Sequence, residues 1–465
     1  MLLHIIMKNI QSKILSLRLY IALILTIIVF CFGSIAFVKS QSDSVEEYNK
    51  YENDYIENMR TAAENNISNL ATETRSYLLK PRVGSFITDS KENYFPGKFN
   101  FSAYNLFGFN PKPGGTNPHM NVTPDLNWAF IISVIISFLV FVLTFDSISG
   151  EKELKTLALS FSNSLSRGTY LFGIYLSSII ISILVLIPGI CISLLILLAS
   201  GTVTLTSEIL FEIVSFIAIT GIFISCIAAF GILSSVITRS SSVSLLFALT
   251  FWLIFIVAIP NTALFWANTL FPIDRAETVN ERISRTLDDI ERNGHPERWN
   301  ASSGNPFLPQ HELRADNQTN RLNAEKRIRD DYYNSMFNQF EKVRLCTLLS
   351  PVSIYEYLNE AVVGGGYLRF KTVWGSLHEY QARFLTFFKE KDSLDEKSPH
   401  WYNPFEDYST SKKPVNFGEV PVFEETAISF DERFAFAAIY LLVMTIYTAV
   451  IYFAAFTMFV RYDVR

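Results

Sequence analysis

The chain has 465 residues, of which 49% are hydrophobic and 18% are charged, and its formal net charge is −5. Such a chain is too apolar for a soluble protein but too charged to lie wholly in lipid, so we expect a polytopic membrane protein with substantial aqueous segments. The balance of charge, without any lysine or arginine cluster, excludes a nucleic-acid-binding protein. A disulfide framework is not expected, because Cys31, Cys191 and Cys226 lie in apolar runs and Cys346 has no cysteine partner in its aqueous segment.

The N-terminal region predicts two helices. Apolar residues within 1–18 recur at helical spacing and the lysines lie off that stripe, which is typical of an amphipathic helix in the membrane interface. The run 19–38 is about 20 residues long, enough to cross the hydrocarbon core. A signal peptide is the alternative, because basic residues precede the run and Ala36 is small. The run is longer than a typical signal-peptide core and lacks a clear small-x-small cleavage site, so we favour an uncleaved span.

Further apolar runs predict an all-α integral membrane protein with about six transmembrane helices. One long run contains Pro188-Gly189, which is expected to kink it. In chain order, the predicted organisation is an amphipathic interfacial helix at 1–18, a span at 19–38, an aqueous segment at 39–128, a span at 129–145, a charged loop at 146–169, spans at 170–199, 209–237 and 243–265, a large aqueous domain at 266–432 and a last span at 435–459.

The long aqueous segments predict a mostly helical exoplasmic domain. The apolar spacing of residues 45–70 suggests that the first span continues outward as a helix. In the second segment 282–291, 322–349, 354–361 and 367–391 have helical patterns, and Gly364-Gly365-Gly366 permits a sharp turn between the last two. The stretch 414–423 is expected to be extended. Apolar residues of these helices need packing partners, which predicts a cap: Tyr332, Met336, Phe340, Phe370, Trp374 and Phe384.

The distribution of basic residues sets the expected orientation. The short loop 200–208 has no lysine or arginine, whereas the segments on the other side of the predicted spans carry them. Because basic residues favour the cytoplasmic side, both termini and the loop 146–169 are expected in the cytoplasm. The basic residues on that side are Lys8, Lys13, Arg18, Lys152, Lys155, Arg167, Arg239, Arg461 and Arg465.

The segment 144–157, with Ser166-Arg167 after it, carries the most informative motif. It resembles the first cytoplasmic loop of type-2 ABC exporter permeases, in which the usual pattern is Asp-x-Ile-x-x-Glu-[Arg/Lys]-Glu-x-Gly-Thr-Leu, followed by Ser-Arg. Lys155 stands where the family usually has glycine, and because lysine is a better helix former we expect a continuous short helix. The matching residues are Asp146, Ile148, Glu151, Lys152, Glu153, Thr156, Leu157 and Arg167.

Two further features resemble the same permeases. The amphipathic first helix is similar to their elbow helix. Leu349-Ser350-Pro351, and Lys80-Pro81 before Ser85, resemble a subgroup in which the exoplasmic domain is enlarged. The resemblance implies that the loop seats in a partner ATPase and transmits its motion to the spans. The residues that it assigns to this ATPase coupling are Asp146, Glu151, Lys152, Glu153, Thr156 and Arg167.

From the residues alone, a solvated loop whose charges keep it out of the bilayer remains the alternative. Glu151 and Glu153 lie near the start of the expected short helix, where its dipole favours negative charge. The chain lacks the Gly-x-x-x-x-Gly-Lys-[Ser/Thr] loop that cradles nucleotide phosphates, so ATP and Mg²⁺ are expected on a separate ATPase subunit, with no cofactor in this chain.

Other motifs give weaker predictions. Gly221, Ser225 and Ala229 leave a smooth helical strip that predicts close helix packing, within the chain or between subunits. The near absence of charge within the spans argues against an ion-coupled mechanism. The histidines and cysteines lack metal-site spacing, and His119-Met120 as a soft-metal site is less expected than a surface loop.

The sequence therefore predicts a non-catalytic permease subunit of an ATP-binding cassette exporter, in a bacterial inner membrane or other plasma membrane. The expected partners are cytoplasmic ABC ATPase subunits, a second copy or homologous permease, membrane lipid and an exoplasmic protein, but no nucleic acid. The alternative function is a non-transporting scaffold or mechanotransmission protein whose exoplasmic domain binds a partner. The substrate cannot be identified from the sequence.

Overall fold

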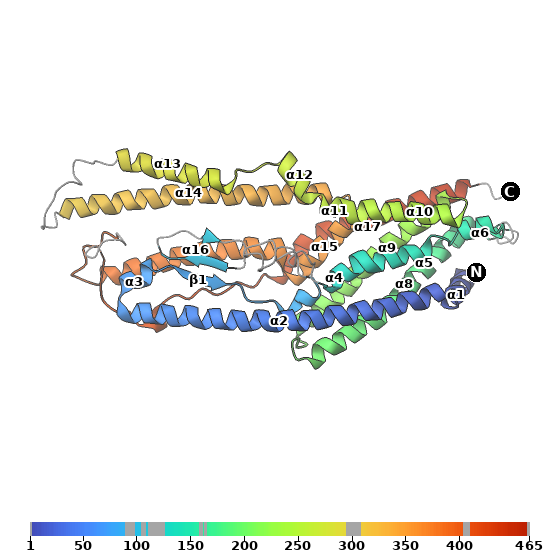
Figure 1. Cartoon of the computed structure of the whole chain (residues 1–465), viewed down its shortest axis with the longest axis horizontal. Coiled ribbons are helices and arrows are strands. Elements are labelled where there is room, and N and C mark those ends of the chain that lie inside the picture. The colour runs from blue at the N-terminus through green and yellow to red at the C-terminus, as the bar shows by residue number, and fades with distance from the viewer. Residues whose placement is uncertain are drawn as a thin grey trace.

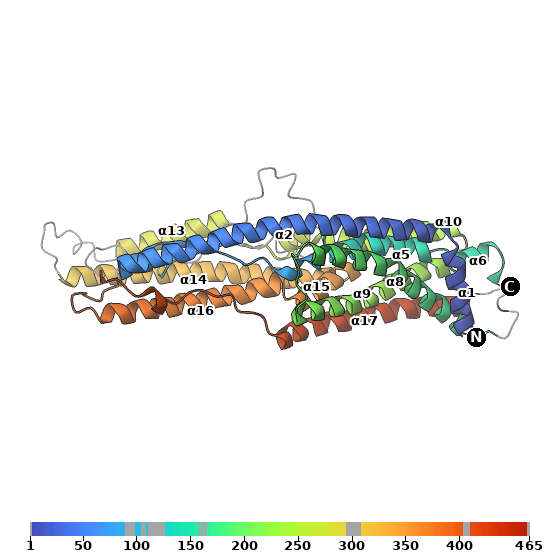
Figure 2. The ribbon, with the colours of Figure 1, turned by 90° about the horizontal axis from the view of Figure 1, so that it is seen from below.

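The molecule is elongated, with a helical bundle that carries both chain termini at one end and a long stalk at the other (Figures 1 and 2). Within the described residues, six helices are long and apolar enough to span a membrane. The bundle and the stalk each have a hydrophobic core. The computed structural model describes residues 2–88, 98–103, 108–109, 126–157, 161, 165–293, 308–402 and 410–462.

The N-terminal region forms a short helix followed by a very long one. Helix α1 (Leu2–Ile14) lies across the termini end of the bundle, and several of its apolar side chains are exposed, as expected for an interfacial helix (Figure 2). Helix α2 (Leu17–Asn65) has 49 residues. At 1.5 Å per residue it is about 70 Å long, more than twice the thickness of a hydrocarbon core, so it continues from the bundle into the stalk.

The second and fifth spans contain π-helical segments. The second consists of α4 (Trp128–Phe130), η3 (Ile131–Ile136) and α5 (Ser137–Thr144), and α6 (Ser149–Glu153) follows after a turn. The fifth consists of α10 (Ser241–Phe251), η4 (Trp252–Ala258) and α11 (Ile259–Asn261). The helix α12 (Ala263–Leu270) is separate, so the run expected as one span to residue 265 is divided at Thr262.

The other three spans are single helices with polar N-caps. They are α8 (Arg167–Ala199), α9 (Ser207–Ile237) and α17 (Phe430–Arg461). The side chains of Ser166, Thr206 and Ser429 each accept a hydrogen bond from a backbone amide in the first turn. Helix α8 continues through Pro188. In the bundle α2 packs on α8, and α9 packs on α17.

Helices dominate the stalk, as predicted. They are α3 (Ile67–Thr72), α13 (Ala276–Asn293), α14 (Leu308–Thr347) and α16 (Gly366–Ser393), and α15 (Pro351–Val363) joins them to the bundle. The stretch 414–423 contains no strand and no helix apart from the single turn η6 (Phe417–Glu419), and Asn416 and Val420 on either side of this turn are extended. At the turn between α15 and α16, Gly364 has a φ of +64°, the left-handed conformation that favours glycine.

A small antiparallel sheet in the stalk was not predicted from the sequence. Its strands β1 (Arg75–Leu78), β2 (Lys98–Phe101) and β3 (Gly108–Phe109) are hydrogen-bonded in that order, and the turn η1 (Val83–Phe86) follows β1. The sheet packs against α2. Aromatic residues from the sheet, α2 and α16 form the stalk core, while α14 contacts α16 through Tyr333 and Phe337.

Candidate functional site

The predicted coupling loop lies at the termini end of the bundle, between the second and third spans (Figure 1). Its described N-terminal part, residues 145–157, is called the anchored loop below. Helix α6 forms its centre. Contacts from six other elements reach the two halves of this connection: α1, α2, α8, α9, α10 and the end of α17.

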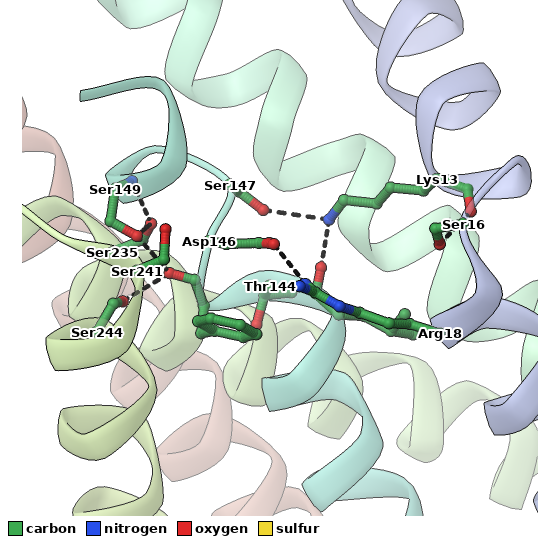
Figure 3. A network of polar contacts seen from close by, with 12 residues as sticks. Lys13, Ser16, Arg18, Thr144, Asp146, Ser147, Ser149, Ser235, Ser241 and Ser244 are labelled. Atoms are coloured by element: carbon green, nitrogen blue, oxygen red, sulfur yellow. Dashed lines mark hydrogen bonds and ion pairs between the residues drawn. The ribbon is translucent and has the colours of Figure 1, made fainter. Parts of the chain in front are cut away.

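A serine of α9 holds the start of α6. The hydroxyl oxygen of Ser235, which is fully buried, accepts hydrogen bonds from the backbone amides of Ile148 at 2.9 Å and Ser149 at 2.8 Å (Figure 3). The Ser149 and Ser244 hydroxyls both donate to the carbonyl oxygen of Phe145, at 2.9 and 2.6 Å. Ser235 therefore supplies the N-terminal cap that the residue before α6, Ile148, cannot provide with its own side chain.

The junction between α1 and α2 contacts the other side of the loop. The Arg18 guanidinium lies 2.5 Å from the Asp146 carboxylate, and the Lys13 ammonium donates to the carbonyl oxygen of Leu143 and, at 3.1 Å, to the Ser147 hydroxyl (Figure 3). Burial lowers the pKa of Lys13 to about 8, although the Asp146 carboxylate acts in the opposite direction. These contacts tie the interfacial helix to the loop.

Lys152 caps the C-terminal end of α9. Its ammonium group donates to the carbonyl oxygens of Val236 at 2.5 Å and Thr238 at 3.0 Å. It also lies 4.3 Å from the ring centroid of Tyr462, just after α17. A cation at this position satisfies helix-terminal carbonyl groups and complements the helix dipole.

The two glutamates of the motif contact neighbouring helices. The Glu153 carboxylate accepts a hydrogen bond from the backbone amide of Ser241 at 2.9 Å, at the first turn of α10. The Tyr170 hydroxyl of α8 donates to the carboxylate of Glu151. Anionic charge at the α10 N-terminus is stabilising because the first-turn amides there have no intrahelical acceptors.

The loop reverses direction directly after α6, so the expectation of a continuous short helix is wrong. Lys155 has a φ of +57°, in the left-handed region. The Thr156 amide donates to the carbonyl oxygen of Glu151 at 3.0 Å, and the Lys155 amide donates to that of Lys152 at 3.2 Å. This pair of bonds is the Schellman motif, in which the left-handed residue is usually glycine. Helix propensity is overridden because the chain must turn at this point.

Only a short stretch of the described loop faces outward. Glu153 is exposed although its carboxylate is bonded to Ser241, and Leu157 is buried. Between them Leu154 is 75% exposed, and Lys155 and Thr156 are also exposed. These three exposed residues are called the tip below. Leu154 is the apolar residue of the tip, next to the polar residues Glu153 and Lys155.

Arg167 anchors the other end of the connection. Its guanidinium donates to the carbonyl oxygens of Val460 at 2.5 Å and Tyr462 at 2.8 Å, at the C-terminal end of α17. Of the residues that sequence assigned to coupling, Asp146, Glu151, Lys152, Glu153 and Arg167 contact their own chain, and Thr156 lies in the tip. The roles of Ser235 and Ser244 could not be predicted, because hydroxyl residues are common throughout these spans.

The small-residue strip on α9 has a mixed environment. Ala229 is buried, and the Ser225 hydroxyl lies 2.6 Å from the Tyr175 hydroxyl of α8. Among the described residues, no atom outside the adjoining backbone of α9 lies within 4 Å of the position where a Cβ of Gly221 would lie. The strip therefore meets another helix of the same chain at Ser225, and its end at Gly221 is open in this single chain.

The closest approach on α9 occurs at a different glycine. A Cβ at Gly231 would lie 1.9 Å from the Thr144 hydroxyl oxygen of α5. Gly189 on α8 is similarly close to Phe30 of α2, where a Cβ would lie 2.7 Å from the ring. These glycines allow the helix backbones to approach each other closely. They were not predicted from the sequence, because neither belongs to the strip of small residues on α9.

The described residues contain no cluster of three or more histidine, cysteine or acidic side chains able to hold a metal ion. The His119-Met120 pair lies outside the described residues. All four cysteines are free thiols.

A family model described as ABC-2 family transporter protein matches residues 4–464, which is almost the whole chain. No curated protein matches the chain. The family match agrees with the loop motif, the mostly helical fold and the six apolar helices. The chain therefore belongs to the ABC-2 transporter family and is a multi-pass integral membrane permease of the type-2 ABC kind.

Proposed function

We propose that this protein is the permease subunit of an ABC exporter that couples ATP hydrolysis on a separate cytoplasmic subunit to export or extraction of a substrate. Family membership supports the permease assignment. The positive-inside rule supports a cytoplasmic position for the end of the bundle that holds both termini and the loop. On this orientation the stalk is exoplasmic and the membrane is the plasma membrane, which in a bacterium is the inner membrane.

The observation that carries the proposal is the contrast between the anchored loop and its exposed tip. The tip, with Leu154 at its apolar centre, is the part that would contact the ATPase. Behind it, polar contacts connect the loop to α2 through Arg18, to α9 through Ser235 and Lys152, and to α10 through Ser241. A displacement of the tip would reach several spans at once, since each contact is short and specific.

On this proposal the coupling residues have two roles. Thr156, with Leu154 and Lys155, would meet the ATPase directly. The other five residues would hold the loop against the neighbouring helices, so that loop and helices move together. These residues are Asp146, Glu151, Lys152, Glu153 and Arg167. The partner ATPase would bind ATP and Mg²⁺, and this chain would contribute no catalytic group.

A complete exporter would contain a second permease, either another copy or a homologue, and two ATPase subunits. The open end of the α9 strip at Gly221 and the lipid-exposed apolar faces of the spans leave surface for such a neighbour. The stalk would stand above the outer exit of the pathway, where it could guide cargo or dock an exoplasmic protein.

The test is purification of the full chain from its native membrane, followed by identification of bound protein and small molecules by mass spectrometry. An ABC ATPase should co-purify, and ATP should drive release of bound material in reconstituted liposomes. A preparation that carries exoplasmic partners but no nucleotide-binding protein would contradict the proposal and support a scaffold.

A further inference from the structure

A cavity of about 190 Å³ opens on the stalk between α2, β1 and the extended segment that leads to α17. Tyr48, Tyr51 and Tyr55 line it from α2, where their three- and four-residue spacing places them on one face of the helix. Tyr77 of β1 and Phe423 complete an aromatic wall, with their ring centroids 4.6 Å apart and edge-to-face. The volume suits a ligand of a few heavy atoms.

The charged residues around this aromatic wall are mostly acidic. Glu52, Glu424 and Glu425 line the cavity with a single lysine, Lys80. Arg369 pairs with Glu425 through two contacts of 2.6 and 2.8 Å and so offsets that carboxylate. Among the lining residues Glu52 and Glu424 still outnumber Lys80, and a small cation in the cavity would compete for them with the nearby ammonium of Lys98.

Tyr77 lines the cavity, and its hydroxyl group has no protein hydrogen-bond partner among the described residues. The residue is only 8% exposed. Burial, with a smaller contribution from the Glu425 carboxylate, raises the pKa of Tyr77 above its ordinary value of 10, so the hydroxyl group remains protonated. The oxygen of this hydroxyl group is not fully shielded from solvent, so a ligand in the cavity would replace water as its hydrogen-bond partner.

The same aromatic wall already holds a cation of the protein itself. The Lys98 ammonium of β2 lies 4.6 Å from the ring centroid of Tyr51. A cation over an aromatic face is attracted by the negative charge on that face, and several such faces with nearby carboxylates are the usual recognition site for ammonium groups.

We propose that the stalk cavity binds a small organic cation through its ammonium group. The rings of Tyr48, Tyr51 and Tyr55 would face the charge, Tyr77 would offer its hydroxyl oxygen, and Glu52 with Glu424 would set the sign of the ligand. Because α2 is continuous with the first span and the other wall leads into α17, an occupied cavity would connect the two membrane helices on the stalk side. Binding itself does not depend on the proposed transport function.

Isothermal titration calorimetry of the full chain in lipid nanodiscs tests this proposal, with no ATPase present. The probes are choline and n-butylamine, each compared with a neutral analogue of the same shape, 3,3-dimethylbutan-1-ol or butan-1-ol. At least one cation should bind about tenfold or more tightly than its neutral analogue. Failure of both cations to bind, or equal binding of a cation and its analogue, would overturn the proposal.

Single substitutions locate the binding. Tyr51→Leu and Glu424→Gln should each weaken binding of the cation, by about threefold to tenfold, while Lys98→Met should strengthen it by removing the competing ammonium group. Glu57→Gln is the matched control, because Glu57 is an exposed glutamate of the same helix that does not line the cavity. An affinity that Tyr51→Leu and Lys98→Met both leave unchanged would place the bound cation elsewhere and refute the assignment.

Discussion

Substitution of Ser235 by alanine should release the start of the anchored loop from α9. The hydroxyl oxygen of Ser235 accepts the amides of Ile148 and Ser149, and all three groups are buried. Leaving a buried amide without an acceptor costs about 1–3 kcal/mol. Two such amides give a local destabilisation of at least about 2 kcal/mol, which corresponds to about 30-fold in an opening equilibrium.

Hydrogen–deuterium exchange of the full chain in nanodiscs, read by mass spectrometry, measures this opening. Peptides covering residues 145–153 should exchange about 30-fold faster in Ser235→Ala than in the wild type. Ser234→Ala is the matched control, because Ser234 is equally buried but donates only to the Phe230 carbonyl of its own helix. It should leave exchange in the loop nearly unchanged.

The reasoning fails if the two variants behave alike. Unchanged loop exchange in Ser235→Ala would show that Ser235 is not the cap of α6. In the assembled exporter, the same variant should also reduce stimulation of ATP hydrolysis by substrate, because only Lys152 would then connect the loop to the end of α9.

Four shorter predictions follow from the same contacts. Lys155→Gly should relieve about 1 kcal/mol of left-handed strain and raise amide protection in the loop, whereas faster exchange would contradict the Schellman turn. Gly231→Ala should lower the free energy of unfolding by about 1–3 kcal/mol, while Gly221→Ala should change it little; thermal melts with equal midpoints would refute the assigned contact. The pKa of Lys13 is about 8 against its ordinary 10.5, so the unfolded chain binds more protons between these values and stability should rise with pH there. Lys13→Met should flatten that rise in the melting temperature, and an identical pH profile would exclude Lys13 as its source. Glu151→Lys should uncouple ATP hydrolysis from transport while the complex still assembles; normal substrate stimulation of hydrolysis in this variant would refute the coupling role.

Much of the fold could be predicted because its signals are long. Apolar runs indicate the six spans, and the loose three–four spacing after residue 38 correctly predicts that α2 continues as a helix beyond its span. The glycines between α15 and α16 turn as expected. The sheet was missed because its described strands have only four, four and two residues, and β1 and β2 are separated by many residues in the sequence.

The candidate site was predictable in location but not in detail. The charged motif identifies the loop, yet its charges mostly bind helix ends of the same chain, and that depends on which ends meet in three dimensions. Lys155 was misjudged because average helix propensity says nothing about a residue that closes a Schellman turn. Gly231 and Gly221 look alike in sequence, and only the position of α5 distinguishes them.

The most direct test of the central claim is photo-crosslinking from the tip. A benzoylphenylalanine at Leu154, introduced into the full chain in its native membrane, should crosslink to an ABC ATPase on illumination. The same probe at Asp288, an exposed stalk residue on α13, serves as the control and should not. An ATPase crosslink from position 154 alone is the result the account predicts. A crosslink from Asp288, or none from Leu154 in a complex that retains its ATPase, would contradict it.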